Sequence, residues 1–212
     1  MQTMTPDAPK KMELTADFRK LRVKPKYSQE VHQWLLSLGS PELMEWLSKA
    51  ALPDVELPVL VLAGAGETGK SLLSKGVSHM WSPWDRFFSV DSTWGDQFLL
   101  TPFAIEDEWG YGAYGTSKKA SRAAQHLTSL AREAEYVCHR KYQAPVVIPG
   151  RMRVVVLADK EVRYPGWLVV PMPQGSAARL AKLSTAKKTR WAEKTIAQHV
   201  LWMNQNDYRG VA

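Results

Sequence analysis

The sequence is poor in cysteine and has no long hydrophobic run. Cys138 is its one cysteine, which excludes an intramolecular disulfide framework and favours a reducing compartment. The five histidines show no metal-ligand spacing, so no zinc site is expected. No apolar stretch approaches the ~18 residues that cross a bilayer. The polar N-terminal stretch lacks the apolar core of a secretion signal. We therefore expect a cytoplasmic protein without a membrane partner.

Acidic residues are in the minority. The 212 residues include 28 Lys and Arg against 21 Asp and Glu, which gives a formal net charge of +7. This excess favours a polyanionic partner such as nucleic acid, because neutralised phosphates release their counterions. Charge alone leaves a merely basic protein as the alternative. Hydrophobic residues make up 45% of the chain, which suits one globular domain of ordinary size.

A glycine-rich stretch, LAGAGETGKSLLSKG at 62–76, fits the phosphate-loop pattern G-x-x-x-x-G-K-[ST]. Glycines reach the backbone angles that turn several N–H groups inward, Lys70 reaches the β- and γ-phosphates, and Ser71 places a hydroxyl on Mg²⁺. A chance glycine-rich turn is the alternative, but an apolar strand pattern precedes the loop and a helical pattern follows it. We expect ATP and Mg²⁺ as cofactors. The predicted nucleotide-binding residues are Gly64, Ala65, Gly66, Glu67, Thr68, Gly69, Lys70, Ser71 and Leu72.

Acidic side chains follow a second apolar strand, in PFAIEDEW at 102–109. Asp107 is expected to hold Mg²⁺ together with Ser71, as a Walker B aspartate does. Glu108 would orient or deprotonate the attacking water. Glu106 competes for either role, and an acidic cap or solvated turn is the structural alternative.

Strand and helix patterns alternate along the chain, which predicts an α/β domain with a mostly parallel sheet. We expect a flexible or docking basic arm over residues 1–26 and a helical lead-in over 27–55. The P-loop core then covers 56–183, and a C-terminal helical segment covers 184–212. Within the lead-in, Ser40 and Pro41 predict the start of a second helix. A helical pattern also extends from Ser117 through Val137.

Taken together, residues 31–208 resemble superfamily 3 helicases, and most of all the AAA+-like ATPase domain of phage and plasmid primase-helicases. The phosphate loop and the Walker B acids are the most specific parts of this resemblance. It implies an AAA+-like P-loop fold with flanking helices and a β-hairpin. It also implies DNA replication as the setting, a homo-oligomeric ring (a hexamer in the family) and a primase or replication-initiator partner. A phage or plasmid gene would place the protein in the cytoplasm of a bacterial host. No primase domain is recognised, so we expect a compact stand-alone unit or a fragment.

The same resemblance assigns further roles. HRKYQAPVVIPGRMR, at 139–153, would be the hairpin that touches single-stranded DNA in the ring channel. Asp159 stands at the sensor position, where the family usually has Asn, and it would add negative charge beside the phosphates unless Lys160 compensates. Arg163 and Arg179 are both candidates for the arginine finger. The DNA-binding candidates are Arg140, Lys141, Tyr142, Arg151 and Arg153, and a solvated basic hairpin is the alternative.

The favoured function is an ATP-hydrolysing, Mg²⁺-dependent motor on single-stranded DNA, with Lys70, Asp107, Glu108 and Asp159 in the catalytic set. An ATP-dependent assembly module on DNA with weak or no hydrolysis is the second hypothesis, and Asp159 favours it. A kinase acting on a small substrate is the third, and Glu108 argues against it. The step from ATPase to helicase rests on family analogy.

Overall fold

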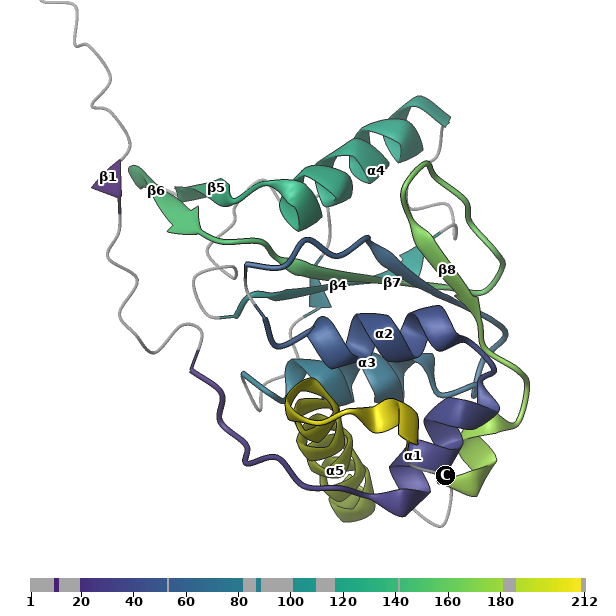
Figure 1. Cartoon of the computed structure of the whole chain (residues 1–212). Coiled ribbons are helices and arrows are strands. Elements are labelled where there is room, and N and C mark those ends of the chain that lie inside the picture. Colours follow the sequence, from purple (N-terminus) through teal and green to yellow (C-terminus); the bar gives the residue numbers. More distant parts are fainter. Residues whose placement is uncertain are drawn as a thin grey trace, which may run out of the picture.

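The computed structural model describes residues 10–11, 20–52, 54–81, 87–88, 101–109, 117–140, 142–180 and 186–210. At its centre is a five-stranded sheet of order β3-β4-β7-β2-β8 in which every neighbouring pair runs parallel (Figure 1). The strands are β2 (Leu60–Ala63), β3 (Phe87–Phe88), β4 (Phe103–Trp109), β7 (Arg153–Ala158) and β8 (Leu168–Pro171). The predicted parallel sheet is therefore confirmed, and β7 separates β2 from β4.

Helix boundaries follow the capping signals in the sequence. The hydroxyl of Ser40 accepts a hydrogen bond from the N–H of Leu43 at 3.1 Å, and Pro41 opens the helix where an N–H is not needed. The second lead-in helix is thus confirmed with its predicted start. The helices are α1 (Gln29–Ser37), α2 (Pro41–Lys49), α3 (Lys70–Ser78), α4 (Ser117–Arg132) and α5 (Ala186–Gln205), with short 3₁₀ turns η2 (Ser176–Arg179) and η4 (Tyr208–Gly210).

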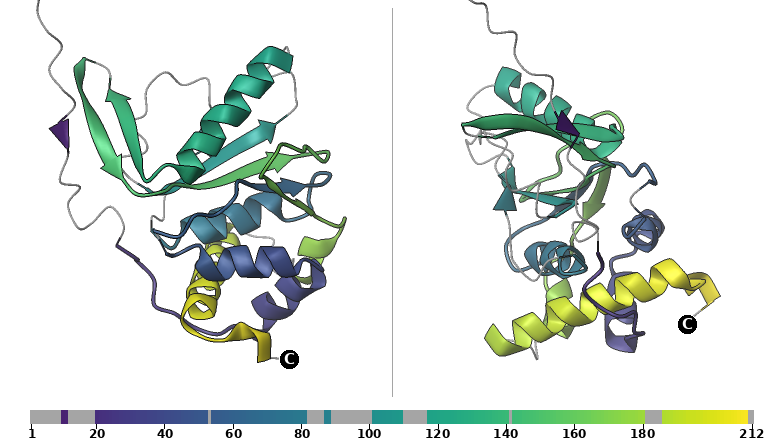
Figure 2. Two further views of the ribbon diagram at one scale, coloured as in Figure 1. Left: turned by 45° about the horizontal axis from the view of Figure 1, so that its top comes forward. Right: turned by 90° about the vertical axis from the view of Figure 1, so that its left-hand side faces the viewer.

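Helices cover both faces of the sheet (Figures 1 and 2). Strand side chains alternate between the faces, so neighbours such as Val61 and Leu62 enter different cores. Leu62 packs with residues of α1, α2, α3 and α5, whereas Val61 packs with residues of α4 such as Leu127. Two apolar clusters, one on each face, thereby hold the sheet between the helical layers.

A hairpin projects from the side of the sheet that α4 covers (Figures 1 and 2). It consists of β5 (Glu135–Arg140) and β6 (Gln143–Pro149), which pair antiparallel, with the short β1 (Lys10–Lys11) beside β6. The helix expected through Val137 ends instead at Arg132. Pairing of Tyr136 with Ile148 explains the correction, because cross-strand partners override the local helical preference of an Ala- and Glu-rich stretch.

The sequence pattern over 184–206 predicts an amphipathic helix with Trp191, Ile196, Val200 and Met203 among its apolar positions. In α5 this apolar side is confirmed for Ile196, Val200 and Met203, which are buried. Trp191 was also expected on this side, but 53% of it is exposed. The rotation of the helix explains the correction, because Ala192 lies one turn before Ile196 and is the buried residue there.

Residues 20–26 of the predicted N-terminal arm dock against the segment directly after α3 and against α5. The N–H of Arg22 donates to the carbonyl of Met80 at 2.7 Å, and its Nε donates to that of Trp81 at 2.8 Å. The N–H of Lys26 donates to the carbonyl of Gln198 at 3.0 Å. Among the described residues, no helix has the combination of length and hydropathy that crossing a membrane requires.

Candidate nucleotide-binding site

The predicted phosphate loop connects the end of β2 to the start of α3. Gly69 precedes the helix in the left-handed conformation, with a φ of 91° that glycine adopts easily. No side chain caps the helix start, and its first turn contains no acidic residue. The first N–H groups of α3 and the positive end of its dipole therefore suit an anion.

Close backbone packing explains another glycine of the loop. A Cβ on Gly64 would lie 2.5 Å from the carbonyl oxygen of Met172, which directly follows β8. The N–H of Gly64 donates to the carbonyl of Ala158 at 2.9 Å, and that of Met172 donates to the carbonyl of Ala63 at 2.6 Å. The loop thus begins between the ends of β7 and β8, where only glycine fits.

Two segments far apart in the sequence support the other end of the loop. A Cβ on Gly69 would approach Trp34 of α1 and Ala177 of η2 at 3.1 Å each. Ser176 donates its hydroxyl to the carbonyl of Thr68 at 2.7 Å. Sequence reasoning missed Trp34 and Ser176 as loop supports. Trp34 stands at a spacing that predicts only a core residue, and no local signal marks Ser176.

Lys70 is the first residue of α3 and is mostly buried. Its Nζ donates to the carbonyl of Gly64, to that of Ala158 at 3.1 Å and to Oδ1 of Asp159 at 2.9 Å. The ion pair joins a lysine side chain that is 10% exposed to an aspartate side chain that is 39% exposed. The structure therefore brings two predicted catalytic residues into direct contact, in a pairing that the sequence did not reveal.

The predicted Walker B acids lie at a bulge of β4. Glu106 is opposite Val156 of β7, and Trp109 is opposite Ala158, so two residues of β4 face one residue of β7. Bulges of this kind re-aim side chains and occur often beside active sites. Because Ala158 also pairs with Ala63, the bulge lies at the same edge of the sheet as the phosphate loop.

The environments of the acids differ. Glu106 is 3% exposed, whereas Asp107 is exposed. Ile105 packs in the core that contains α3, whereas Trp109 packs in the core that contains α4, so the strand changes face across the bulge. Asp107 thus fits a metal ligand better than Glu106 does, while the side chain of Glu108 lies outside the described part of the chain. Trp109, the last residue of β4, is buried and packs on Trp167, with ring centroids 5.5 Å apart.

Mg²⁺ prefers oxygen ligands and keeps several waters, so one hydroxyl and one carboxylate are a chemically suitable protein contribution. Ser71 and Asp107 offer these groups, and both are exposed. The described residues contain no group of three or more His, Cys, Asp and Glu side chains that could hold a metal ion by themselves. The donor set therefore suits a metal that arrives with phosphate oxygens.

The basic residues near the hairpin fall into different environments. Tyr142, at the turn, is 92% exposed and has a positive φ of 58°. Arg153 is 1% exposed, and its guanidinium donates to the carbonyls of Ala50, at 2.9 Å, and Leu52. The predicted DNA contact by Arg153 is therefore wrong, because this side chain anchors the end of the lead-in to β7.

Arg151 also makes structural contacts. Its Nε donates to the carbonyl of Arg132 at 3.0 Å, and one terminal nitrogen donates to the carbonyl of Asp54 at 3.0 Å. These contacts tie the base of the hairpin to the end of α4 and to the segment before β2, and the DNA contact of Arg151 stays a prediction. Lys141 and the side chain of Arg140 lie outside the described residues.

The arginine-finger candidates lie on different segments. Arg163, between β7 and β8, is exposed and donates to Oε2 of Glu161 at 2.8 Å. Arg179 ends η2, the turn that supports the phosphate loop, but its side chain is outside the described part of the chain. The described side chain of Arg163 pairs with Glu161, and the choice between the two arginines stays a prediction.

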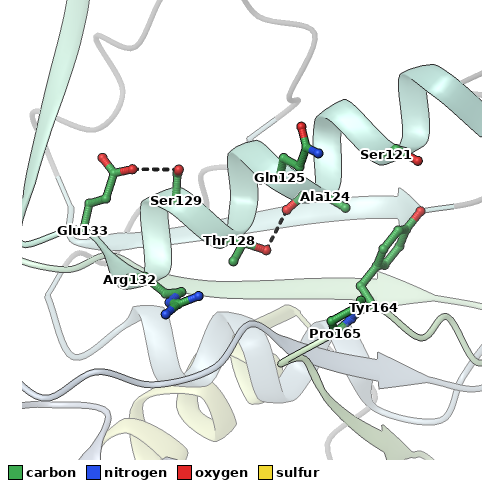
Figure 3. Close-up of a pocket in the computed structure, with 9 residues that line it drawn as sticks. All are labelled: Ser121, Ala124, Gln125, Thr128, Ser129, Arg132, Glu133, Tyr164 and Pro165. Atoms are coloured by element: carbon green, nitrogen blue, oxygen red, sulfur yellow. Dashed lines mark hydrogen bonds between the residues drawn. The ribbon is translucent and has the colours of Figure 1, made fainter.

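A separate hollow lies between α4 and the segment after β7 (Figure 3). Its volume is about 660 Å³. An adjoining hollow of about 440 Å³ reaches Val59 and Trp167, at the amino ends of β2 and β8. The phosphate loop follows the carboxyl end of β2, so this adjoining hollow belongs to the opposite edge of the sheet and not to the candidate nucleotide site. The first is lined by Ser121, Ala124, Gln125, Thr128, Ser129, Arg132, Glu133, Tyr164 and Pro165.

Comparison with known proteins supports the fold. Two apo structures of the NrS-1 C-terminal region superpose with TM-scores of 0.62 and 0.55, each at 13% identity, over 92% and 91% of this chain. JCV helicase with a bound thiazolopyridine compound superposes with a TM-score of 0.52 at 11% identity, over 88% of this chain. This chain spans 48% of each NrS-1 chain and 63% of the JCV helicase chain. No protein-family model and no curated protein sequence matches it. The chain thus has a helicase-like P-loop fold.

Proposed function

We propose that this chain is a Mg²⁺-dependent P-loop ATPase whose turnover is coupled to single-stranded DNA, as in superfamily 3 helicases. The observation that carries the proposal is the position of Lys70. It opens an uncapped helix at the edge of the sheet where the acids of β4 also lie. Similarity in fold to a helicase supports the choice of motor chemistry.

In this proposal each residue has a defined task. The N–H groups at the start of α3 and Lys70 bind the β- and γ-phosphates. Ser71 and Asp107 hold Mg²⁺, which supplies charge neutralisation at the phosphates. Glu108 orients the attacking water and accepts its proton.

Single-stranded DNA and a ring of several copies are part of the same proposal. The net charge of +7 and the exposed ring of Tyr142 at the hairpin turn suit a single strand, through counterion release and base stacking. A neighbouring copy would contribute Arg163 or Arg179 as the arginine finger. A primase or replication initiator is the partner that the family resemblance suggests.

A second candidate function is an assembly module that binds ATP on DNA and hydrolyses it slowly. The specific observation that favours it is the ion pair between Lys70 and Asp159. A negative charge at the sensor position disfavours a bound polyphosphate and thereby opposes rapid turnover.

Steady-state ATP hydrolysis with and without single-stranded DNA separates these functions. For the motor we expect stimulation by DNA, and a loss of at least about a hundredfold in Lys70→Ala and in Glu108→Gln. Lys75→Ala removes a lysine from the same helix and should keep the activity. ATP binding without turnover under any condition would favour the assembly module, whereas equal turnover in Lys70→Ala would disprove the site.

A further inference from the structure

We propose that Asp159 is an internal competitor for the phosphate-binding lysine, which lowers the affinity of the unliganded chain for nucleotides. This inference rests on the proposed function and concerns the regulation of the same site. It assigns Asp159 a task different from sensing the γ-phosphate.

The hydrogen-bonding capacity of Lys70 carries the argument. A lysine ammonium has three N–H donors and no acceptor. In this chain the Nζ of Lys70 already has three acceptors within hydrogen-bonding distance: the carbonyls of Gly64 and Ala158 and Oδ1 of Asp159. A phosphate can therefore bind Lys70 only after one of these partners is displaced.

Asp159 is the partner that can leave. The carbonyls of Gly64 and Ala158 belong to backbone that is fixed at the edge of the sheet, since the N–H of Gly64 donates to Ala158 and Ala158 pairs with Ala63. Asp159 instead lies just beyond β7, and its contact with Lys70 is made by a side chain that is 39% exposed. Rotation of this side chain releases Lys70 without disturbing the sheet.

The competition has a direct electrostatic consequence. The charge-assisted contact between Lys70 and Asp159 is stronger than a neutral hydrogen bond. Breaking it to let Lys70 bind a phosphate therefore lowers the affinity for ATP. Once released, the carboxylate of Asp159 remains near the incoming phosphates and repels them. Asp159→Asn keeps the size of the side chain but removes both effects, and we therefore expect it to bind ATP about tenfold more tightly.

The matched control is Glu161→Gln. Glu161 is an exposed acid two residues from Asp159, and it pairs with Arg163 rather than with Lys70. Glu161→Gln removes one negative charge from the same loop without changing the contacts of Lys70. It should therefore change ATP affinity by less than about twofold.

The first half of the test is made without nucleotide. Melting temperatures are measured for the full chain and for Lys70→Ala, Asp159→Asn and the double variant. If the pair exists, the double variant should melt about 2–4 °C higher than the sum of the single effects predicts. Additive effects would show that the two side chains do not interact, which would overturn the inference whatever the chain binds.

The second half is calorimetric titration of Mg²⁺-ATP into the same proteins and into Glu161→Gln. Tighter binding by Asp159→Asn alone is the expected result. Unchanged or weaker binding by Asp159→Asn would overturn the competition while leaving the proposed function intact. Absence of ATP binding by every variant, despite coupled melting temperatures, would instead reject the proposed function together with the competition.

Discussion

At the scale of single residues, Tyr142 and Arg153 stand near the same hairpin in sequence but differ in their surroundings. Tyr142 presents its ring to solvent at the turn, whereas Arg153 is buried against two backbone carbonyls of the lead-in. A sequence pattern of scattered basic and aromatic residues does not distinguish such positions. The carbonyl of Ala50 is 103 residues from Arg153 along the chain, so only the folded structure reveals their contact.

We predict that substitution of Tyr142 affects DNA binding, whereas substitution of Arg153 affects stability. Tyr142→Ala should weaken binding of single-stranded DNA about tenfold with little change in stability, because it removes one stacking surface. Arg153→Lys keeps the charge but not the forked geometry, so it should lower the free energy of unfolding by about 1–3 kcal/mol and leave DNA affinity unchanged. Fluorescence anisotropy and urea unfolding measure the two effects. Weaker DNA binding by a folded Arg153→Lys would contradict the assignment of Arg153 to the lead-in.

At the scale of elements, α3 approaches α5 closely at Gly76. A Cβ on Gly76 would lie 2.6 Å from Cγ2 of Ile196 and 2.7 Å from its Cβ. Ile196 is a β-branched residue of α5 and is buried in the core. Its side chain therefore has little room to move. Glycine at this position therefore lets α3, the helix after the predicted phosphate loop, pack closely on α5.

Gly76→Ala tests this packing. Alanine favours a helix by about 1 kcal/mol over glycine, but the overpacking costs roughly 1–3 kcal/mol and should dominate. We expect a lower melting temperature and weaker ATP binding. Lys75→Ala, one residue earlier and partly exposed, is the control and should change stability by less than about 0.5 kcal/mol. An unchanged or higher melting temperature for Gly76→Ala would refute the close helix approach.

Some elements could be predicted from the sequence, and others could not. The apolar run before the glycines predicted β2, and Ser40 with Pro41 predicted the start of α2, because strand burial and helix capping are local signals. The bulge of β4 was not predictable, since it is a feature of its pairing with β7, a strand far away in the sequence. The contact between Lys70 and Asp159 was missed for the same reason, because strand order and not sequence distance brings them together.

At the scale of the whole molecule, a histidine pair joins the lead-in to the C-terminal helix. Nδ1 of His32 on α1 lies 3.2 Å from Nε2 of His199 on α5, and Tyr27 and Trp202 pack around them. The N–H of Ser28 donates to Nδ1 of His199 at 3.1 Å, so Nε2 of His199 carries the hydrogen in the neutral ring. Protonation of His199 would remove the acceptor that Ser28 needs.

This arrangement predicts that stability falls in mild acid. The pKa of His199 is lowered from 6.5 to about 4, mainly by burial and to a smaller extent by the charge of His32. Because the unfolded chain then binds more protons, the contribution of His199 is complete above pH ~6.5 and is lost as the pH falls toward ~4. Between pH 7.5 and pH 5 the loss should be about 2 kcal/mol.

Urea unfolding at both pH values measures this loss. His199→Phe should reduce the pH dependence, whereas His139→Gln, which replaces an exposed histidine on β5, should leave it unchanged. If the free energy of unfolding depended on pH equally in the unaltered chain and in His199→Phe, this residue would not titrate as described.

The central claim is that the loop between β2 and α3 binds ATP, and calorimetric titration of the full chain with Mg²⁺-ATP tests it most directly. We predict saturable binding of about one nucleotide per chain, lost in Lys70→Ala and retained in Lys75→Ala. Binding that persists unchanged in Lys70→Ala, or no binding by the unaltered chain and by Asp159→Asn, would contradict the account.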